Sequence, residues 1–299
     1  MSILAVGTVA FDSVETSGGE VRNGIGGSAT YFSAAASFYG PVALIAVVGQ
    51  DFPVSSLEFL KDRNVDLSGL EVKDGKTFSW SGKYEENMNN RHTIETNLNV
   101  LLDFQPKLKE EHCKLDHLFL ANLDPDIQNS VLDQSTGSGI VGSDTMDFWI
   151  EGNRESLLLM LKQIDLLIIN DSEARQLVEE VNLVRAAKKI LNLGPQTVVI
   201  KKGEHGASLF TADTYFSVPA YPVVDVIDPT GAGDSFAGGF IGYLSECNQK
   251  SVEAMKKAMI HGSIMASFNV EDFSTRRLEL LTREEISKRH DKFLAMITP

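Results

Sequence analysis

The sequence is poor in cysteine and has no long apolar run. Cys113 and Cys247 are its only cysteines; they are far apart and fit no metal-ligand spacing. Two distant cysteines build no disulfide framework, so a disulfide-stapled secreted fold is excluded. No apolar run reaches the roughly 20 residues of a membrane helix, and Met1-Ser2-Ile3-Leu4 shows neither a basic region nor a cleavage site. We therefore expect a cytoplasmic protein without a membrane partner.

Positive charge is scarce as well. The 27 Lys and Arg residues face 41 Asp and Glu residues, which gives a formal net charge of −14, and no Lys/Arg-rich run stands out. Nucleic-acid-binding proteins usually carry a basic patch, so a nucleic-acid partner is not expected. A nucleotide ligand stays compatible with this charge, because a helix N-terminus and one or two lysines act locally.

The sequence does contain a regular alternation of strand-like and helix-like segments. Alternation of this kind predicts parallel βαβ units that bind ligands at the C-terminal edge of the sheet. With no internal repeat or flexible linker, we expect a single α/β domain over residues 1–299. The predicted strands are Ile3–Gly7, Val42–Val48, His117–Leu123, Gly139–Ser143, Leu166–Asn170 and Thr197–Lys201, and the predicted helices include Arg154–Lys162, Leu183–Leu193 and Ser251–Phe268.

Residues 13–24 and 66–98 interrupt the alternation. In Thr77–Tyr84, aromatic and polar residues alternate with period two, and a polar turn leads to a second run at Arg91–Thr96. This pattern predicts strands of a small sheet that is exposed on one face. The small sheet could be a lid that excludes water from a ligand, an arm for a homodimer, or an ordinary edge sheet.

The most informative stretch runs from Asp228 to Phe240 and reads Asp-Pro-Thr-Gly-Ala-Gly-Asp-Ser-Phe-Ala-Gly-Gly-Phe. The strand-like residues Val223–Ile227 precede it and a small-residue helix follows, which predicts a strand-to-helix junction. The first N–H groups of a helix and its dipole bind anions. Gly231 and Gly233, on either side of Ala232, let a phosphate approach these N–H groups.

Asp234 lies within this predicted anion site, where a carboxylate repels the ligand that the site attracts. One interpretation makes it a base that takes a proton from a hydroxyl as the hydroxyl attacks a phosphoryl group. The other makes it a helix cap. The stretch alone leaves both interpretations open.

Other polar residues follow predicted strands. Asp12 comes shortly after the first strand, where it could bind a ligand or close a turn. Asn170 with Glu173 is typical of a capping box, and the same two residues could hold a hydrated Mg²⁺. Lys201 and Lys202, with the flexible turn from Gly203 to Gly206, offer charge near the same phosphates.

A second reading of the N-terminal glycines predicts a different enzyme. Gly24-x-Gly26-x-x-Ala29 fits the dinucleotide fingerprint, and Asp51 could be its acidic partner. This would indicate an NAD-dependent oxidoreductase. The fingerprint should directly follow a buried strand, however, and the residues before Gly24 are polar.

Taken together, these motifs resemble those of the PfkB or ribokinase-like family of carbohydrate and nucleoside kinases. The stretch from Asp228 to Phe240 is similar to the family's C-terminal signature, and Gly26-Gly27-Ser28-Ala29 is similar to its N-terminal one. Asn170-x-x-Glu173 resembles the Mg²⁺ and phosphate motif, and Lys202-Gly203-x-x-Gly206-Ala207 resembles the nucleotide-side turn. The resemblance implies a ribokinase-like three-layer α/β/α sandwich with a mostly parallel central sheet, a β-sheet lid, Mg·ATP as donor and a primary hydroxyl as acceptor.

The resemblance also implies roles for single residues. Asp234 would be the base, and the turn Gly231-Ala232-Gly233 with the N–H of Asp234 would form the anion hole. Further roles would be acceptor binding by Asp12, Gly26 and Gly27, nucleotide binding by Asn170, Glu173, Lys202, Gly203 and Gly206, Mg²⁺ binding through water by Asn170 and Glu173, and binding of a monovalent cation such as K⁺ by Asp228 and Thr230.

The chain departs from the family pattern at Tyr31, which stands where ribokinase-type members have a sugar-binding Asn. An aromatic side chain there adds a stacking face, and with Trp80 and Tyr84 of the lid it favours a nucleoside acceptor. Arg22, Lys83 and Arg91 could instead serve a phosphorylated sugar. We expect an ATP-dependent transfer of the γ-phosphoryl group, with a simple sugar kinase or a catalytically silent nucleotide or sugar sensor as alternatives.

Overall fold

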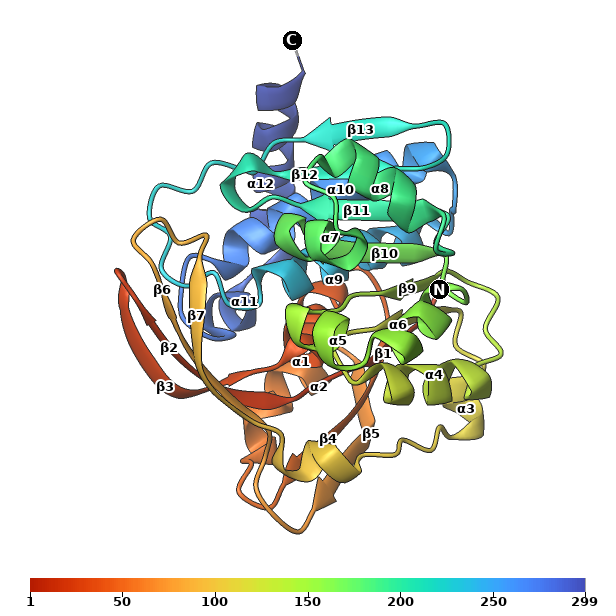
Figure 1. Cartoon of the computed structure of the whole chain (residues 1–299). Coiled ribbons are helices and arrows are strands. Elements are labelled where there is room, and N and C mark those ends of the chain that lie inside the picture. Colours follow the sequence, from red (N-terminus) through yellow and green to blue (C-terminus); the bar gives the residue numbers. More distant parts are fainter. Residues whose placement is uncertain (299) are drawn as a thin grey trace.

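The computed structural model describes residues 1–298, which form a large sheet covered by helices and a small sheet beside it (Figure 1). A nine-stranded sheet has the order β13-β12-β11-β10-β9-β8-β1-β4-β5, and a separate four-stranded sheet has the order β3-β2-β6-β7. The large sheet is parallel from β5 to β11, and β12 and β13 are antiparallel. The predicted mostly parallel sheet and small extra sheet are thus confirmed.

The strands of the large sheet are β1 Ile3–Val6, β4 Val42–Gly49, β5 Val65–Lys73, β8 His117–Leu120, β9 Val141–Ser143, β10 Leu166–Asn170, β11 Thr197–Lys201, β12 Ala207–Phe210 and β13 Tyr215–Val218. Those of the small sheet are β2 Ala10–Thr16, β3 Gly19–Gly26, β6 Ser79–Tyr84 and β7 Arg91–Asn97. The helices are α1 Ser28–Ala36, α2 Glu58–Asp62, α3 Glu110–Cys113, α4 Pro125–Gln134, α5 Asp147–Gly152, α6 Arg154–Leu161, α7 Asp171–Val178, α8 Leu183–Leu191, α9 Ala232–Cys247, α10 Val252–Asn269, α11 Arg276–Leu280 and α12 Arg283–Ile297, with short 3₁₀ turns η1 Val54–Leu57, η2 Asn99–Asp103 and η3 Gly203–His205.

Helices cover both faces of the large sheet, which gives three layers. Successive side chains of a strand point to opposite faces, so Ile3 and Ala5 of β1 join one buried cluster and Leu4 and Val6 join another. The first cluster contains side chains of α1, α9 and α10, and the second contains side chains of α4, α6, α7 and α8. Both faces of the sheet are therefore sealed, and ligands are left to the strand ends.

Glycines in α9 let this helix pack closely between its two neighbours. A Cβ on Gly238 would lie 2.4 Å from the carbonyl oxygen of Phe32 in α1, and one on Gly239 would lie 2.7 Å from that of His261 in α10. Side chains at these positions would push the helices apart. The small residues seen in the sequence thus fix the position of α9, and with it the position of its N-terminus.

Two predictions about segment boundaries are wrong. Residues 223–227, expected as a strand, form an irregular connection in which Val224 is 95% exposed. The chain has left the sheet after β13, so no neighbouring strand is available to pair with these valines. The second lid segment, expected at 66–98, begins later, because β5 pairs with β4 in the large sheet and Leu67 and Leu70 pack on its core. Its lid strands are β6 and β7.

The small sheet stands to one side of the large one (Figure 1). Val14, Val21, Trp80 and Tyr84 on one of its faces form a small cluster with Phe273, which comes from the segment after α10. The edge strand β7 is exposed over most of its length. The small sheet is therefore anchored to the main body through one face. Within residues 1–298, no helix is both long and apolar enough to cross a membrane.

Candidate active site

The N-terminus of α9 is open, as the glycine turn predicts. Gly231 precedes the helix with φ 77°, and no side chain caps this end. The N–H of Ala232 donates to the carbonyl of Pro229 at 3.1 Å, whereas the N–H groups of Gly233 and Asp234 find no backbone acceptor within residues 1–298. Two of the three N–H groups expected to form the anion hole are thus without a backbone acceptor.

Asp234 stands in the first turn of α9 and is partly buried. Burial raises the pKa of its carboxyl to about 6, against the lowering effect of the charges on Lys201 and Arg91. A carboxyl with this pKa is ionised at neutral pH and is a stronger base than an exposed aspartate. The geometry therefore favours the base over the cap at Asp234.

A second aspartate, which the sequence reading missed, faces Asp234. Asp144 directly follows β9, is 5% exposed, and its Oδ1 has no hydrogen-bond partner. Burial and then the neighbouring Asp234 raise the pKa of Asp144 well above its usual range. The signal was present, because a polar residue after a buried strand lies at the ligand edge, and the same rule was applied to Asp12.

Lys201, rather than the predicted Lys202, carries the positive charge next to the turn. Lys201 is the last residue of β11, and its Nζ lies 2.6 Å from where a Cβ on Gly233 would be. The Nζ of Lys202 instead reaches Ser217 Oγ at 3.5 Å. Neighbouring strand residues point to opposite faces, so only one of two adjacent lysines could enter the site.

Asn170 and Glu173 form the capping box of α7 that their spacing predicts. The Oδ1 of Asn170 accepts from the N–H of Glu173 at 2.8 Å, and Oε2 of Glu173 accepts from the N–H of Asn170 at 2.8 Å. Burial raises the pKa of Glu173, while the charge on Lys201 lowers it. Glu173 therefore supports the helix end and also faces the charged groups of the site.

The donor set at this edge suits a hydrated Mg²⁺. Mg²⁺ prefers hard oxygen ligands, and the carboxyl oxygens of Asp144 and Glu173 are of this kind. A bound cation would favour the ionised forms of both carboxyls against the burial that raises their pKa values. Within residues 1–298, no group of three or more His, Cys, Asp or Glu side chains could hold a metal by itself. A Mg²⁺ ion at this edge would therefore take its remaining ligands from water or from substrate phosphates.

Asp12 lies against the double glycine, the residues that the resemblance assigns to the acceptor. Asp12 on β2 is 5% exposed, and a Cβ on Gly26 would lie 1.9 Å from its Oδ2. Burial and then the charge of Asp228 raise the pKa of Asp12 to about 7, while a hydrogen bond from the Gly27 N–H lowers it. Gly27, at φ 95°, has no space for a side chain beside Thr8.

Tyr31 supports the catalytic turn rather than offering a stacking face. It is 1% exposed, and a Cβ on Gly231 would lie 2.4 Å from its ring. Its hydroxyl is buried without a hydrogen-bond partner. Burial, and then the charges of Asp12 and Asp228, raise the pKa of this hydroxyl well above its usual range. The expected aromatic platform at this position is absent because the ring fills the space under Gly231.

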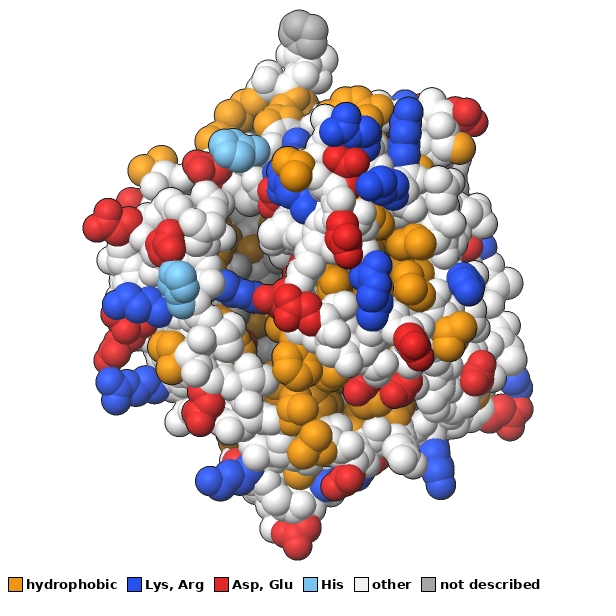
Figure 2. Space-filling view, in the orientation of Figure 1, with side chains coloured by type: hydrophobic (Ala, Val, Ile, Leu, Met, Phe, Trp, Pro, Cys, Tyr) orange, Lys and Arg blue, Asp and Glu red, His pale blue; other side chains and the backbone are white. Residues whose placement is uncertain are grey.

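The small sheet contributes two side chains to the site. Tyr84 contacts the turn through its hydroxyl, 3.4 Å from Thr230 Oγ1. Arg91 lies with its guanidinium 5.6 Å from the ring of Trp80, and its charge lowers the pKa of Asp12 as well as that of Asp234. Figure 2 shows the molecule hollowed between the small sheet and the main body, with basic and acidic side chains at the edge of the hollow.

The tip of the small sheet also reaches the nucleotide-side turn. Gly203 and Gly206 have φ 54° and 81°, so both need glycine. A Cβ on Gly203 would lie 2.3 Å from Asn89 Oδ1, and Asn89 Nδ2 donates to Glu204 Oε1 at 2.9 Å. The turn between β6 and β7 thus touches the far side of the hollow.

Other candidate residues have structural partners. Asp51 accepts from the N–H and the hydroxyl of Thr77 at 2.8 and 2.6 Å, and Gly24 lies in β3 of the small sheet, so the dinucleotide reading loses its support. Arg22 pairs with Glu20 and Lys83 pairs with Glu15 on the exposed lid surface. Of the three cations considered for a phosphorylated sugar, Arg91 alone acts on the carboxyls of the site.

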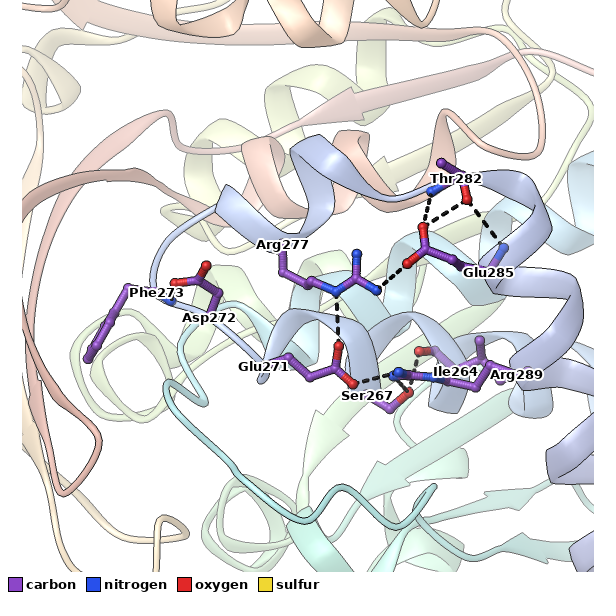
Figure 3. Close-up of polar contacts among 9 residues, drawn as sticks. All are labelled: Ile264, Ser267, Glu271, Asp272, Phe273, Arg277, Thr282, Glu285 and Arg289. Carbon is purple, nitrogen blue, oxygen red and sulfur yellow. Dashed lines mark hydrogen bonds and ion pairs between the residues drawn. The ribbon is translucent and has the colours of Figure 1, made fainter.

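The segment after α10 joins the turn to the small sheet. Asp228 is buried, and its carboxylate accepts from the N–H of Thr230 at 2.9 Å and from that of Ser274 at 3.4 Å. Phe273 enters the cluster of the small sheet. Figure 3 shows how Glu271 fixes the segment, accepting from Arg277 Nε at 2.9 Å and from Arg289 at 2.5 Å.

A helix N-terminus that can hold a phosphoryl group, beside a carboxyl that can take up a proton, defines an enzyme that transfers phosphoryl groups to hydroxyls. The comparison with known families agrees. The model of the pfkB family carbohydrate kinases matches residues 2–279, so the chain belongs to this family and is a kinase.

Similar proteins include kinases for nucleosides and for sugars. A cytidine kinase of Thermococcus kodakarensis is 26% identical over 275 residues, which cover 87% of this chain and 96% of the relative. A nucleoside kinase of Burkholderia thailandensis, solved in complex with ADP-inosine, matches with a TM-score of 0.79 at 17% identity over 98% of this chain and 96% of its own. A fructokinase of Vibrio cholerae, solved with fructose, ADP and calcium ion, matches with a TM-score of 0.77 at 18% identity over 96% and 98%. These two structures confirm the fold.

Proposed function

We propose that the protein transfers the γ-phosphoryl group of Mg·ATP to a primary hydroxyl of a nucleoside. The observation that carries the transfer is the position of Asp234. Its carboxyl stands in the first turn of α9, beside N–H groups without backbone partners and under the charge of Lys201. A base and an anion hole within one helical turn suit a hydroxyl and a phosphoryl group that must meet.

In this mechanism, Asp234 takes the proton of the acceptor hydroxyl as its oxygen attacks the γ-phosphorus. The N–H groups of Gly233 and Asp234 donate to the phosphoryl oxygens, whose charge grows during transfer. Asp12 and the Gly27 N–H orient the acceptor hydroxyls, and the small sheet limits the access of water. Mg²⁺, held by Asp144 and Glu173 partly through water, would neutralise phosphate charge.

The proposal of a nucleoside acceptor is supported by sequence similarity to a cytidine kinase rather than by Tyr31. The cytidine kinase is related along almost its whole length, whereas the fructokinase shares the fold at lower identity. Trp80 of the lid is 9% exposed and packs in the cluster of the small sheet, so, like Tyr31, it offers no open stacking face, and Arg91 over its ring supplies only a cation on this side. The buried ring of Tyr31 no longer contributes to this argument.

An ADP-release screen tests the proposal. Cytidine, three other nucleosides, ribose and fructose are each supplied with Mg·ATP, and the products are identified by mass spectrometry. We expect turnover with a nucleoside and a 5′-monophosphate as product. Preferred turnover with a free sugar would assign the sugar kinase alternative, and ATP binding without any turnover would assign the sensor alternative.

Two finer features belong to the same proposal. A monovalent cation at Asp228 and Thr230 would bring oxygen ligands near the turn, although both carboxylate oxygens of Asp228 already accept N–H groups. Stimulation of turnover by K⁺ over Na⁺ tests it. Dimerisation through the small sheet would use strand β7, whose exposed residues are mainly polar. Sedimentation analysis tests this association.

A further inference from the structure

Lys201 lies next to the glycine turn, and the mechanism above gives its ammonium group no contact with the substrate. Lys201 ends β11, and its Nζ lies against Gly233, at the position that a Cβ on this glycine would contact at 2.6 Å. Gly233 contributes one of the N–H groups without a backbone acceptor. The ammonium group therefore lies beside Gly233 at the start of α9.

The surroundings of Lys201 are acidic. Its charge lowers the pKa values of Asp234, Glu173 and Asp144, so it acts on every carboxyl at the donor end of the site. A lysine that served only as an ion-pair partner would form a close contact with one carboxylate. Within residues 1–298, no hydrogen bond or ion pair within 4.0 Å joins Lys201 to any of these acids. Its donors therefore remain available to a ligand in the anion hole.

We propose that Lys201 is a catalytic residue that binds the transferred phosphoryl group in the anion hole through its ammonium group. This inference rests on the proposed function and adds a residue to it. During transfer, the acceptor oxygen forms its bond to the γ-phosphorus while its proton goes to Asp234. The bond from the γ-phosphorus to the bridging oxygen breaks, and ADP leaves with that electron pair. Lys201 keeps its protons throughout and donates hydrogen bonds to the non-bridging oxygens.

The position also explains why a lysine is useful there. A point charge on a flexible chain can follow the phosphoryl group as it moves from donor to acceptor oxygen. Charge-assisted hydrogen bonds aimed at the developing charge are among the largest contributions to catalysis. The same charge favours the ionised form of Asp234, so it keeps the base ready at neutral pH.

The test compares Lys201→Met with Lys202→Met, which removes the neighbouring ammonium group that bonds to Ser217. We expect Lys201→Met to lower kcat by about 10²-fold, the scale of losing one oxyanion donor, with little change in the KM of the acceptor. Lys202→Met should keep kcat near that of the wild type. Lys201→Arg should recover part of the loss, because it restores the charge.

Two further readouts separate catalysis from a structural role. The acid limb of the pH profile should move upward in Lys201→Met by about one pH unit, because an opposite charge near Asp234 is lost. Affinity for a non-hydrolysable ATP analogue should fall by about tenfold, with ADP affinity unchanged, because the charge meets the γ-phosphoryl group.

Equal losses in both lysine variants, or equal weakening of ADP and the ATP analogue, would overturn the assignment of Lys201. Failure of the proposed function is distinguishable, because the wild-type enzyme itself would then turn over no acceptor. The binding comparison would still decide whether Lys201 meets the γ-phosphoryl group. Melting temperatures of all variants show whether a loss comes from misfolding.

Discussion

The donor end and the acceptor end of the site are built in different ways. At the donor end, Gly231, Gly233 and Asp234 are neighbours in sequence, and the start of one helix presents them together. At the acceptor end, Asp12 and Gly26 meet across two strands of the small sheet, and Arg91 comes from a third. The donor end therefore depends on local backbone geometry. The acceptor end depends on how the small sheet packs on the main body.

The largest loss of activity is expected when the proposed general base of the donor end, Asp234, is replaced. Asp234→Asn keeps the size of the side chain but removes the proton acceptor, and we expect kcat to fall by roughly 10²-fold or more. The measurement is ADP release with the preferred acceptor. In the wild-type enzyme, kcat/KM should rise with pH through about 6, because burial raises the pKa of Asp234 to about 6 and the base acts in its ionised form. Near wild-type turnover in the variant would refute the assignment.

Asp12→Asn probes the acceptor end. We expect it to weaken binding of the acceptor and to stabilise the folded protein at high pH. Loss of a charged hydrogen bond, about 1.5–3 kcal/mol, should raise the KM of the acceptor by tenfold or more. The pKa of Asp12 is about 7 in the folded protein, above its unfolded value, so its stabilising contribution is complete at low pH and is lost as the pH rises through about 7.

The Tm gap between Asp12→Asn and the wild type should therefore widen by about 5 °C between pH 5 and pH 8, in favour of the variant. Thermal unfolding at both pH values measures it. A Tm difference that does not change with pH would mean that folding does not raise the pKa of Asp12.

Glu173→Gln separates the two roles of the donor-end capping box. Glutamine can keep the box, so Tm should change little, whereas the loss of charge should raise the Mg²⁺ requirement by about tenfold. Titration of turnover with Mg²⁺ measures this. The matched control is Glu285→Gln, in the capping box of α12 away from the site, which should leave the Mg²⁺ requirement unchanged. A loss of stability alone in Glu173→Gln would mean that this residue only caps α7.

The smallest effect is expected for Tyr31→Phe. The ring that supports Gly231 stays, and a buried hydroxyl without a partner is removed, so Tm should stay equal or rise slightly. Acceptor KM should stay within about twofold of the wild type, since no hydrogen bond is lost. A tenfold rise in the KM of the nucleoside would instead show that the Tyr31 hydroxyl contributes to acceptor binding.

The contrast between local geometry and long-range packing also explains which features could be predicted from the sequence. The βαβ alternation, the glycine turn at Gly231 and the capping box at Asn170 were readable, because period and turn chemistry are local properties. The grouping of Asp12 with Gly26 and Gly27 came from the family resemblance instead. The choice of Lys201 over Lys202 needed the register of β11. The burial of Tyr31 and the exposed connection at 223–227 depend on which elements pack together, and composition does not encode that directly.

The segment from Glu271 to Ser274 has one more consequence. Ser274 bonds to the carbonyl of Ile25 on the small sheet and to the carboxylate of Asp228, and Phe273 packs inside the small sheet. A swing of the small sheet away from the body would pull on this segment and so loosen the ligand turn at the start of α9. One short segment of the chain thus ties the small sheet to the turn at the start of α9.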